Sequence, residues 1–212
     1  MLATTHTETV PADFRGRALP RCHVATVDRG NGHVISNGMG LPRLWFRAAK
    51  AVTGGFCQGF DGSTETGRPR IEQAVESARR SLLSSSDQLI ERMAPDATLV
   101  AVLLNGSNLN AIHAGRGRVY VNRDGQPKRL TERQEGPLGL LRTPPVHTTA
   151  AVSPGDLVIA GTASAFSVRS IGRLAQVLEE EPNTAPSVIA HLLTDPARRA
   201  GVGAATLVMR IH

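Results

Sequence analysis

The spacing of apolar residues changes several times along this chain, and these changes limit the folds that it can adopt. Segments in which apolar residues recur every three to four positions predict helices, and segments in which they alternate predict strands. Turns rich in Gly, Asn, Asp and Pro separate the strands. In chain order we predict a hairpin over 21–40, helices over 44–58 and 71–93, strand pairs over 97–115, 118–131 and 146–162, helices over 168–178 and 185–193, and a closing strand over 205–212.

This order of elements indicates an α+β protein, because the strands come in runs and the helices are segregated between them. We predict an α-β-β-α sandwich, in which two antiparallel sheets pack face to face and helices flank them on the outside. The chain shows no internal repeat and no linker long enough to divide it, so residues 15–212 are expected to form a single domain. Residues 1–14 are expected to be a flexible lead.

Composition narrows the classes of partner. The net charge of +6 is spread over scattered arginines, and no basic block is interleaved with the aromatic residues, which make up only 3% of the chain. We therefore expect no nucleic-acid partner. No apolar run reaches the length of about eighteen residues that a membrane span requires, so no membrane partner and a cytoplasmic location are expected. Cys22 and Cys57 are expected to be free thiols.

Four segments, taken together, resemble the metal-dependent protein serine/threonine phosphatases of the PPM family, in its bacterial stress-response and sporulation branch. SNGMG at 36–40 is similar to the family's DGMGG turn, and the segment 108–131 is similar to its GDSRAYLLRDG stretch. Residues 136–166 match the PLG…PGD…TDG pattern, and GAATLVMRI at 203–211 matches the closing DDATLVVLRV strand. The resemblance implies a domain that binds two or more Mg²⁺ or Mn²⁺ ions between its sheets.

The carboxylates that such ions need are missing from the matching positions. Hard divalent cations favour anionic oxygen, and two ions close together repel each other unless several negative charges surround them. The matching positions hold Asn37, Arg116, Thr162 and the pair Gly203-Ala204, and the stretch 17–27, where the family has an early acid, contains no Asp or Glu. We therefore predict no metal and no cofactor. What remains of the opening turn is a backbone bend at Gly38 and Gly40.

Other residues could give the altered cleft a different chemistry. Gly161, Thr162 and Ser164 could contact an anion or another ligand at the start of the next helix, with Arg116 as a countercharge. Cys22 and His23 could meet His33 as metal ligands, but their spacing matches no common metal motif. Cys22 could also be a nucleophile with His23 or His113 as its base, but adjacent residues on a strand point to opposite faces. Burial is the simpler interpretation of these side chains.

Three functions follow from the altered cleft. The first is a catalytically inactive PPM-like domain that binds a protein partner, phosphorylated or not, as a regulatory module. The second is a metal-free enzyme that acts on a small molecule in a biosynthetic pathway, since function depends on the site and not on the fold. The third is an active phosphatase with a remade metal site. The exposed sheet edges of a small sandwich also allow a homodimer.

Overall fold

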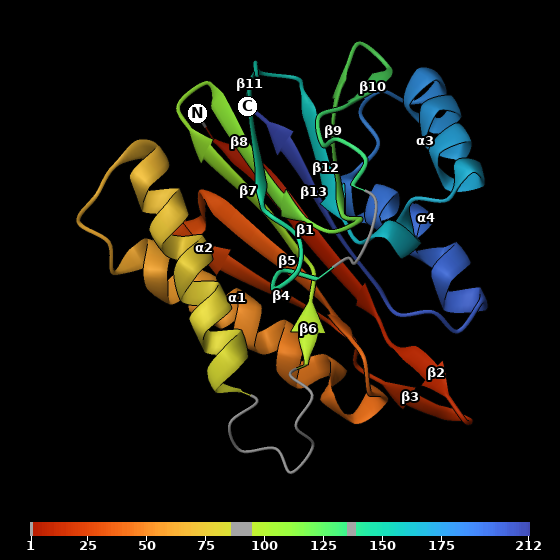
Figure 1. The fold of residues 1–212 in the computed structure, drawn as a ribbon. Helices are drawn as coiled ribbons and strands as arrows, with labels where there is room; N and C mark the ends of the chain where they lie inside the picture. Colours follow the sequence, from red (N-terminus) through yellow and green to blue (C-terminus); the bar gives the residue numbers. More distant parts are fainter. Residues whose placement is uncertain (1, 86–94, 135–138) are drawn as a thin grey trace.

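The computed structural model describes residues 2–85, 95–134 and 139–212, and it confirms the predicted α-β-β-α sandwich (Figure 1). All of the ladders between its strands are antiparallel within these ranges. The first sheet has the strand order β1 (Ala3–Val10), β13 (Ala204–Ile211), β12 (Leu157–Gly161), β9 (Arg118–Arg123) and β10 (Gln126–Arg129). The second has the order β11 (Val146–Ala151), β8 (Asn108–Ala114), β7 (Leu99–Asn105), β5 (Gly32–Met39) and β4 (Cys22–Val27), with β6 (Asp96–Ala97) beside β5.

Helices cover the outer face of each sheet. α1 (Trp45–Asp61) and α2 (Gly67–Ser84) lie on the second sheet, and α3 (Val168–Glu180) and α4 (Pro186–Arg199) lie on the first (Figure 1). Short 3-10 turns precede or follow strands at Asp28–Gly30 (η1), Pro42–Leu44 (η2) and Ala163–Ala165 (η3), and a small hairpin of β2 (Ala12–Phe14) and β3 (Arg17–Leu19) projects from one corner.

The central strands are apolar on both faces because each sheet lies between another sheet and a helical layer. On β7, for example, Val100 and Val102 belong to the core between the sheets, whereas Leu99 and Ala101 face α1 and α2. The same alternation divides the first sheet, where Leu207 faces inward. Every second residue of a central strand therefore points toward the space between the sheets, and this rule locates the side chains of the candidate site.

Most predicted elements form where the sequence places them. The predicted hairpin over 21–40 forms as β4 and β5, and its register pairs Cys22 with Asn37. α2 begins at Gly67, earlier than predicted, and positions 86–93 of the predicted helix lie outside the described residues, as do 136–138 of the PLG segment. The strands around Pro154-Gly155-Asp156 join different sheets, β11 in the second and β12 in the first.

The predicted flexible lead is wrong for residues 3–14. β1 pairs with β13 along its full length, from Ala3 opposite Ile211 to Val10 opposite Ala204, and β2 pairs with β3. β1 lies at the edge of its sheet and most of its side chains are at least partly exposed, so the segment ATTHTETV lacks the apolar alternation that marks a buried strand. Its β-branched threonines are the signal that sequence reasoning passed over.

None of the helices in the described ranges combines the length and the apolar character that crossing a bilayer would require. The cytoplasmic location and the single-domain organisation stay predictions.

Candidate functional site

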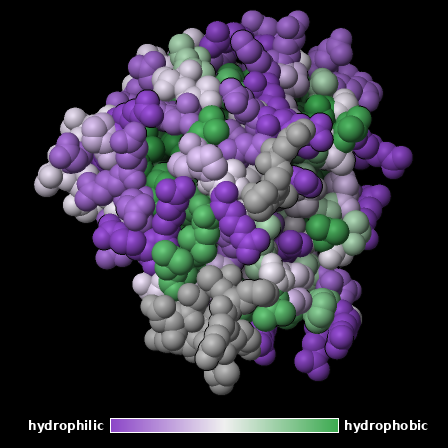
Figure 2. Space-filling view, viewed as in Figure 1, coloured by the Kyte–Doolittle hydropathy of each residue, from purple (hydrophilic) through white to green (hydrophobic). Residues whose placement is uncertain are grey.

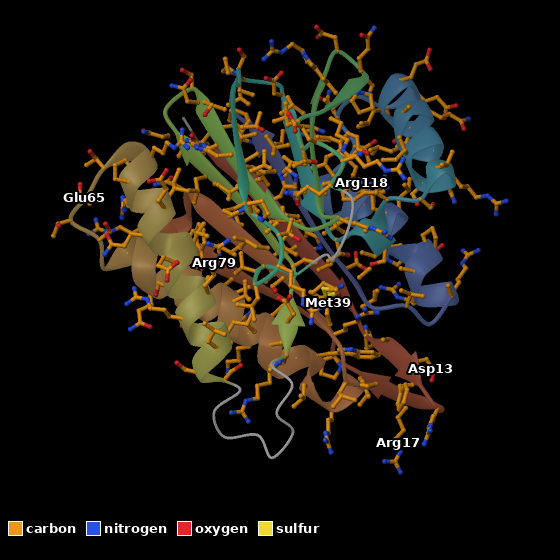
Figure 3. The ribbon with its side chains drawn as sticks, viewed as in Figure 1. Asp13, Arg17, Met39, Glu65, Arg79 and Arg118 are labelled. Atoms are coloured by element: carbon orange, nitrogen blue, oxygen red, sulfur yellow. The ribbon has the colours of Figure 1, made fainter. Side chains whose placement is uncertain are left out.

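The predicted site residues converge on one end of the sandwich. Asn37 lies near the end of β5, Thr162 directly follows β12, and Gly203 directly precedes β13. Figure 3 labels Met39 on β5 and Arg118 on β9, which mark this end of the two sheets. A residue that sequence reasoning did not single out joins the two sides. We call this group the Arg21 site; it consists of Arg21, Cys22, Asn37, Gly38, Thr162, Ser164 and Gly203.

Arg21 contacts both sheets. Its Nε atom donates a hydrogen bond to the carbonyl oxygen of Gly38 at 3.0 Å, and its guanidinium lies over the ring of Trp45, 4.6 Å from the ring centroid. Its stem packs against Gly203, where a Cβ atom would lie only 2.8 Å from the Cβ of Arg21. A half-buried cation therefore sits between the end of β5 and the start of β13.

On the second sheet, Asn37 is held by neighbours on both of its sides. The Cys22 thiol lies 3.4 Å from the Asn37 Oδ1 atom and donates to it, while the Asn37 backbone bonds to Thr98 through both its N–H and its carbonyl group. Burial raises the pKa of the Cys22 thiol to about 12, although the neighbouring Arg21 acts in the opposite direction. The thiol is therefore neutral near pH 7 and serves as a donor to the amide.

On the first sheet, the hydroxyl groups of Thr162 and Ser164 bond to each other at 2.9 Å. The Ser164 hydroxyl also donates to the Gly203 carbonyl at 2.8 Å, and the Thr162 hydroxyl accepts the backbone N–H of Ala205 at 3.1 Å. Both hydroxyl groups thus tie the η3 turn to the start of β13. These are the residues that the sequence offers for anion contact, and here they are engaged within the protein.

Three of the predicted site residues lie at the same end of the sandwich but outside this group. Arg116 is exposed in the turn between β8 and β9 and makes no hydrogen bond or ion pair with any residue of the described ranges. Ala204 faces the α4 side of the first sheet, in the core that lies under the helices. Gly161 is buried, and a side chain there would meet the Ala205 carbonyl and the Phe166 ring. None of the three adds a functional group to the Arg21 site.

The two glycines of the SNGMG turn serve different purposes. Gly40 has a φ of +81°, a left-handed conformation that glycine adopts without strain. Gly38 lies within β5, and a Cβ atom on it would come within 2.0 Å of the Trp45 carbonyl oxygen. The bend expected at both glycines therefore belongs to Gly40 alone, whereas Gly38 lets the first turn of α1 approach the strand.

The histidine and cysteine candidates do not form a reactive cluster. Cys22 faces the core between the sheets, while His23 points the other way and its Nδ1 atom lies 2.7 Å from the Thr53 hydroxyl, under α1. Burial, and then the nearby Lys50 charge, lower the pKa of His23. His33 and His113 are buried on other parts of the second sheet, and the described residues contain no group of three or more His, Cys, Asp or Glu side chains placed to hold a metal.

Comparison with solved structures gives long matches to bacterial phosphatases. The Mycobacterium tuberculosis serine/threonine phosphatase PstP/Ppp superimposes with a TM-score of 0.82 at 16% identity, and the alignment covers 100% of both chains. The PstP catalytic domain in complex with two manganese ions gives a TM-score of 0.79 at 18% identity over 99% of each chain. PppA, a regulatory component of the type VI secretion system of Pseudomonas aeruginosa, gives 0.80 at 14% identity over 100% of this chain and 99% of PppA.

This chain has the PPM phosphatase fold. At these identities the likeness establishes the fold alone. Searches of protein-family models and of curated proteins found no match.

The residues present do not fit the pair of divalent ions that the PPM fold implies. At this end of the sandwich, the described residues of the Arg21 site offer an amide, hydroxyl groups and backbone carbonyls as ligands, and Arg21 adds a positive charge. One carboxylate that is distant in sequence comes near, because Asp96 pairs with Met39 in the β5–β6 ladder. Its Oδ1 atom already accepts the backbone N–H groups of Ala97 and Leu141. Among the described residues, this single carboxylate beside a cation does not compensate for the repulsion between two divalent ions.

Arg21 lies within the stretch 17–27, where the PPM resemblance places an acid and this chain has none. The missing acid is evident from the sequence, whereas the positive charge that takes its place becomes evident only in the fold. The signal was present, since Arg21 directly precedes β4, whose first residue is buried. Its partner Trp45, the single tryptophan of the chain, gave no such signal because it opens an amphipathic helix.

Proposed function

We propose that this chain is a catalytically inactive PPM-type domain that acts as a binding module for a protein partner. The observation that carries the proposal is the position of Arg21, which donates to the Gly38 carbonyl and packs on Gly203. A guanidinium cannot be deprotonated near neutral pH, so it is a permanent positive charge at the place where the fold's ions would need negative ones.

The packing of Arg21 adds a steric reason. The resemblance aligns Gly203-Ala204 with an Asp-Asp pair, but a side chain at position 203 would overlap the stem of Arg21. Restoring the carboxylate would therefore require Arg21 to move first. The absence of an acid at position 203 and the presence of Arg21 therefore depend on each other. This mutual dependence favours a structural role for this end of the sandwich over a remade metal site.

The metal-free enzyme is the alternative that the geometry favours less. Its candidate nucleophile is Cys22, whose pKa of about 12 leaves very little thiolate near neutral pH. His23, the nearest base in sequence, points to the opposite face of the sheet toward Thr53.

Calorimetric titration of the protein with MnCl₂ and MgCl₂ tests the inactive state, together with phosphate release from a phosphoserine peptide. The PstP catalytic domain, which binds manganese, is the positive control. We expect no saturable metal binding and no phosphate release. Saturable binding of two ions together with turnover would establish the active phosphatase instead.

The binding role is tested by placing a photo-crosslinking amino acid at Met39, which is partly exposed beside the Arg21 site. In cells that normally express the chain, we expect a crosslinked product with the discrete mass of one partner protein. The same crosslinker at Gly172, an exposed position on α3, is the control for random contacts. Retention of a small molecule by the purified protein, without crosslinked protein, would favour the metal-free enzyme.

A further inference from the structure

The folded chain gathers aromatic and basic side chains that are separated in sequence. The protein contains one tryptophan, one tyrosine and five phenylalanines, and three of these rings lie partly exposed at a single corner. Phe14 comes from the β2–β3 hairpin, and Trp45 and Phe46 come from the first turn of α1. The rings of Phe14 and Trp45 meet edge to face with their centroids 6.2 Å apart, which joins the hairpin to the helix.

Arginines lie on both of these rings. The Arg15 guanidinium is 5.4 Å from the centroid of Phe14, and the Arg21 guanidinium is 4.6 Å from that of Trp45. Arg17 lies directly opposite Phe14 in the β2–β3 ladder and extends away from the body of the protein (Figure 3). We call this group the basic corner; it consists of Phe14, Arg15, Arg17, Arg21, Trp45 and Phe46.

The charge at the basic corner is one-sided. Asp13 is the acidic residue of the hairpin, and its Oδ1 atom already accepts the backbone N–H of Gly16 at 2.9 Å. Arg15 and Arg17 are exposed and form no ion pair with the described residues. Arg43 and Arg47 add two further cations beside Trp45, each with interactions of its own. Figure 2 shows apolar side chains next to hydrophilic ones over this corner, at the lower right of the view.

An exposed aromatic ring with a cation on its face suits a partner that carries carboxylates better than it suits single-stranded nucleic acid. Single-stranded nucleic acid binds by stacking its bases on open aromatic faces. Here Arg15 covers a face of Phe14 and Arg21 covers a face of Trp45. A guanidinium that stacks on a ring can still donate from its N–H edge to a carboxylate. In Arg21 the Nε–H already bonds to the Gly38 carbonyl, so a carboxylate would bind to its Nη groups.

We propose that the basic corner binds an extended acidic segment of a protein partner, with Asp or Glu carboxylates on Arg15, Arg17 and Arg21 and an apolar side chain beside Phe14. This proposal rests on the binding role proposed above and names the chemistry of the partner. It also explains why Phe14 is left 38% exposed in a chain with so few aromatic residues, since an apolar side chain of the partner would cover it.

The probe is a short peptide of alternating glutamate and leucine, and the matched probe replaces each glutamate by glutamine. Trp45 is the single tryptophan, so its fluorescence reports directly on occupancy of the basic corner. We expect the acidic peptide to change this fluorescence saturably, with an affinity that falls as salt is raised, and the glutamine peptide to have no effect.

The double variant Arg15→Glu/Arg17→Glu is expected to weaken binding by about tenfold or more, because it reverses two charges that face the peptide. The control variant Arg169→Glu/Arg173→Glu makes the same change at exposed positions of α3 and should bind as the wild type does. Urea unfolding of both variants confirms that each is folded.

The outcomes separate this proposal from the one on which it rests. No binding of the acidic peptide, equal weakening by both double variants, or tighter binding of single-stranded poly(U) would overturn the acidic-segment proposal and leave the inactive domain untouched. Metal binding with phosphate release would overturn the proposal that the domain is inactive. The acidic-segment proposal would still be tested independently by the Arg15→Glu/Arg17→Glu variant.

Discussion

The side chain of Arg21 fills the space that a side chain at Gly203 would need. A Cβ atom on Gly203 would lie 2.8 Å from the Arg21 Cβ, 3.3 Å from its Cδ and 3.4 Å from the Cβ of Ala12. The residue that precedes β4 and the residue that precedes β13 are thus packed against each other across the two sheets. The identity of either one restricts what the other can be.

This packing predicts that Gly203→Ala is destabilising in the wild type and much less so without the arginine. Overpacking at a close contact costs about 1–3 kcal/mol in the free energy of unfolding. In an Arg21→Gly background most of that cost should disappear, so a double-mutant cycle measured by urea unfolding should give a coupling of about 1 kcal/mol or more. Gly172→Ala is the control, because a side chain there meets open space. Additive effects of the two substitutions would show that the residues do not compete for space.

A second prediction concerns Gly38. Gly38→Ala would place its Cβ atom 2.0 Å from the Trp45 carbonyl oxygen, so α1 or β5 would have to shift. We expect a loss of about 3 kcal/mol or more, at the upper end of overpacking costs. Gly54→Ala, in the middle of α1 with open space around it, should instead stabilise the protein by about 0.5–1 kcal/mol. Equal effects in thermal or urea unfolding would contradict the close approach of helix and strand.

Acid stability should depend on His33. This side chain is only 6% exposed, neither ring nitrogen has a hydrogen-bond partner among the described residues, and burial lowers its pKa below the ordinary value of 6.5. Below about pH 6.5 the unfolded chain therefore binds a proton that the folded protein does not, and stability falls as the pH falls toward the lower folded pKa.

His33→Leu removes this titration. Relative to the wild type, the variant should gain about 1 kcal/mol between about pH 7.5 and pH 5. Near pH 8 the His33 imidazole is neutral in both the folded and the unfolded protein. The difference in stability between variant and wild type at that pH therefore measures the effect of the substitution on packing alone. If stability falls with pH equally in the two proteins, the imidazole of His33 takes up its proton as readily in the folded state as in the unfolded state, and the prediction is wrong.

A fourth prediction concerns Asp156, which follows the Pro154-Gly155 turn. Arg123 holds its carboxylate with two hydrogen bonds, Nε to Oδ1 at 2.9 Å and Nη2 to Oδ2 at 2.6 Å, and the Ser153 N–H donates to Oδ2 as well. The bonds from Arg123, followed by that from Ser153, outweigh burial and lower the pKa of Asp156. A lowered folded pKa stabilises the protein above the unfolded value of about 3.9, and that contribution is lost as the pH falls through the folded pKa.

Asp156→Asn should therefore destabilise the protein by about 1 kcal/mol at pH 7, a modest amount because Arg123 is half exposed. The difference from the wild type should shrink as the pH is lowered below about 4. Urea unfolding at a series of pH values measures it. A difference that does not change with pH would assign the effect of the substitution to packing.

The sandwich itself could be predicted from the sequence. The spacing of apolar residues indicates which faces are buried, and the turn residues indicate where strands end. The β4–β5 hairpin and the inward position of Asn37 follow from alternation around η1. β1 escaped prediction because an edge strand has no apolar alternation. The basic corner escaped it for a different reason: Phe14, Arg21 and Trp45 are separate in sequence, and only the packing of the hairpin against α1 brings them together.

The absence of acidic residues at the matching positions could be predicted from the sequence, but the contacts of Arg21 at this site could not. Matching positions revealed missing acids at Asn37, Thr162 and Gly203, because residue identity alone decides that. The contact of Arg21 with Gly203 depends on the distance between two sheets, and no local pattern encodes such a distance. Asp96 shows the same principle, since it is far from Met39 in sequence and opposite it in the fold.

The pairing of β1 with β13 also has a consequence for how the protein is made. Ala3–Val10 is synthesised long before its partner strand Ala204–Ile211, so β1 cannot pair within the first sheet until β13 has been made. During that interval β1 has no ladder to join, and unpaired strands of this kind readily pair with other chains. Its threonines, histidine and glutamate make the unpaired segment hydrophilic. This property reduces its tendency to aggregate before β13 has been synthesised.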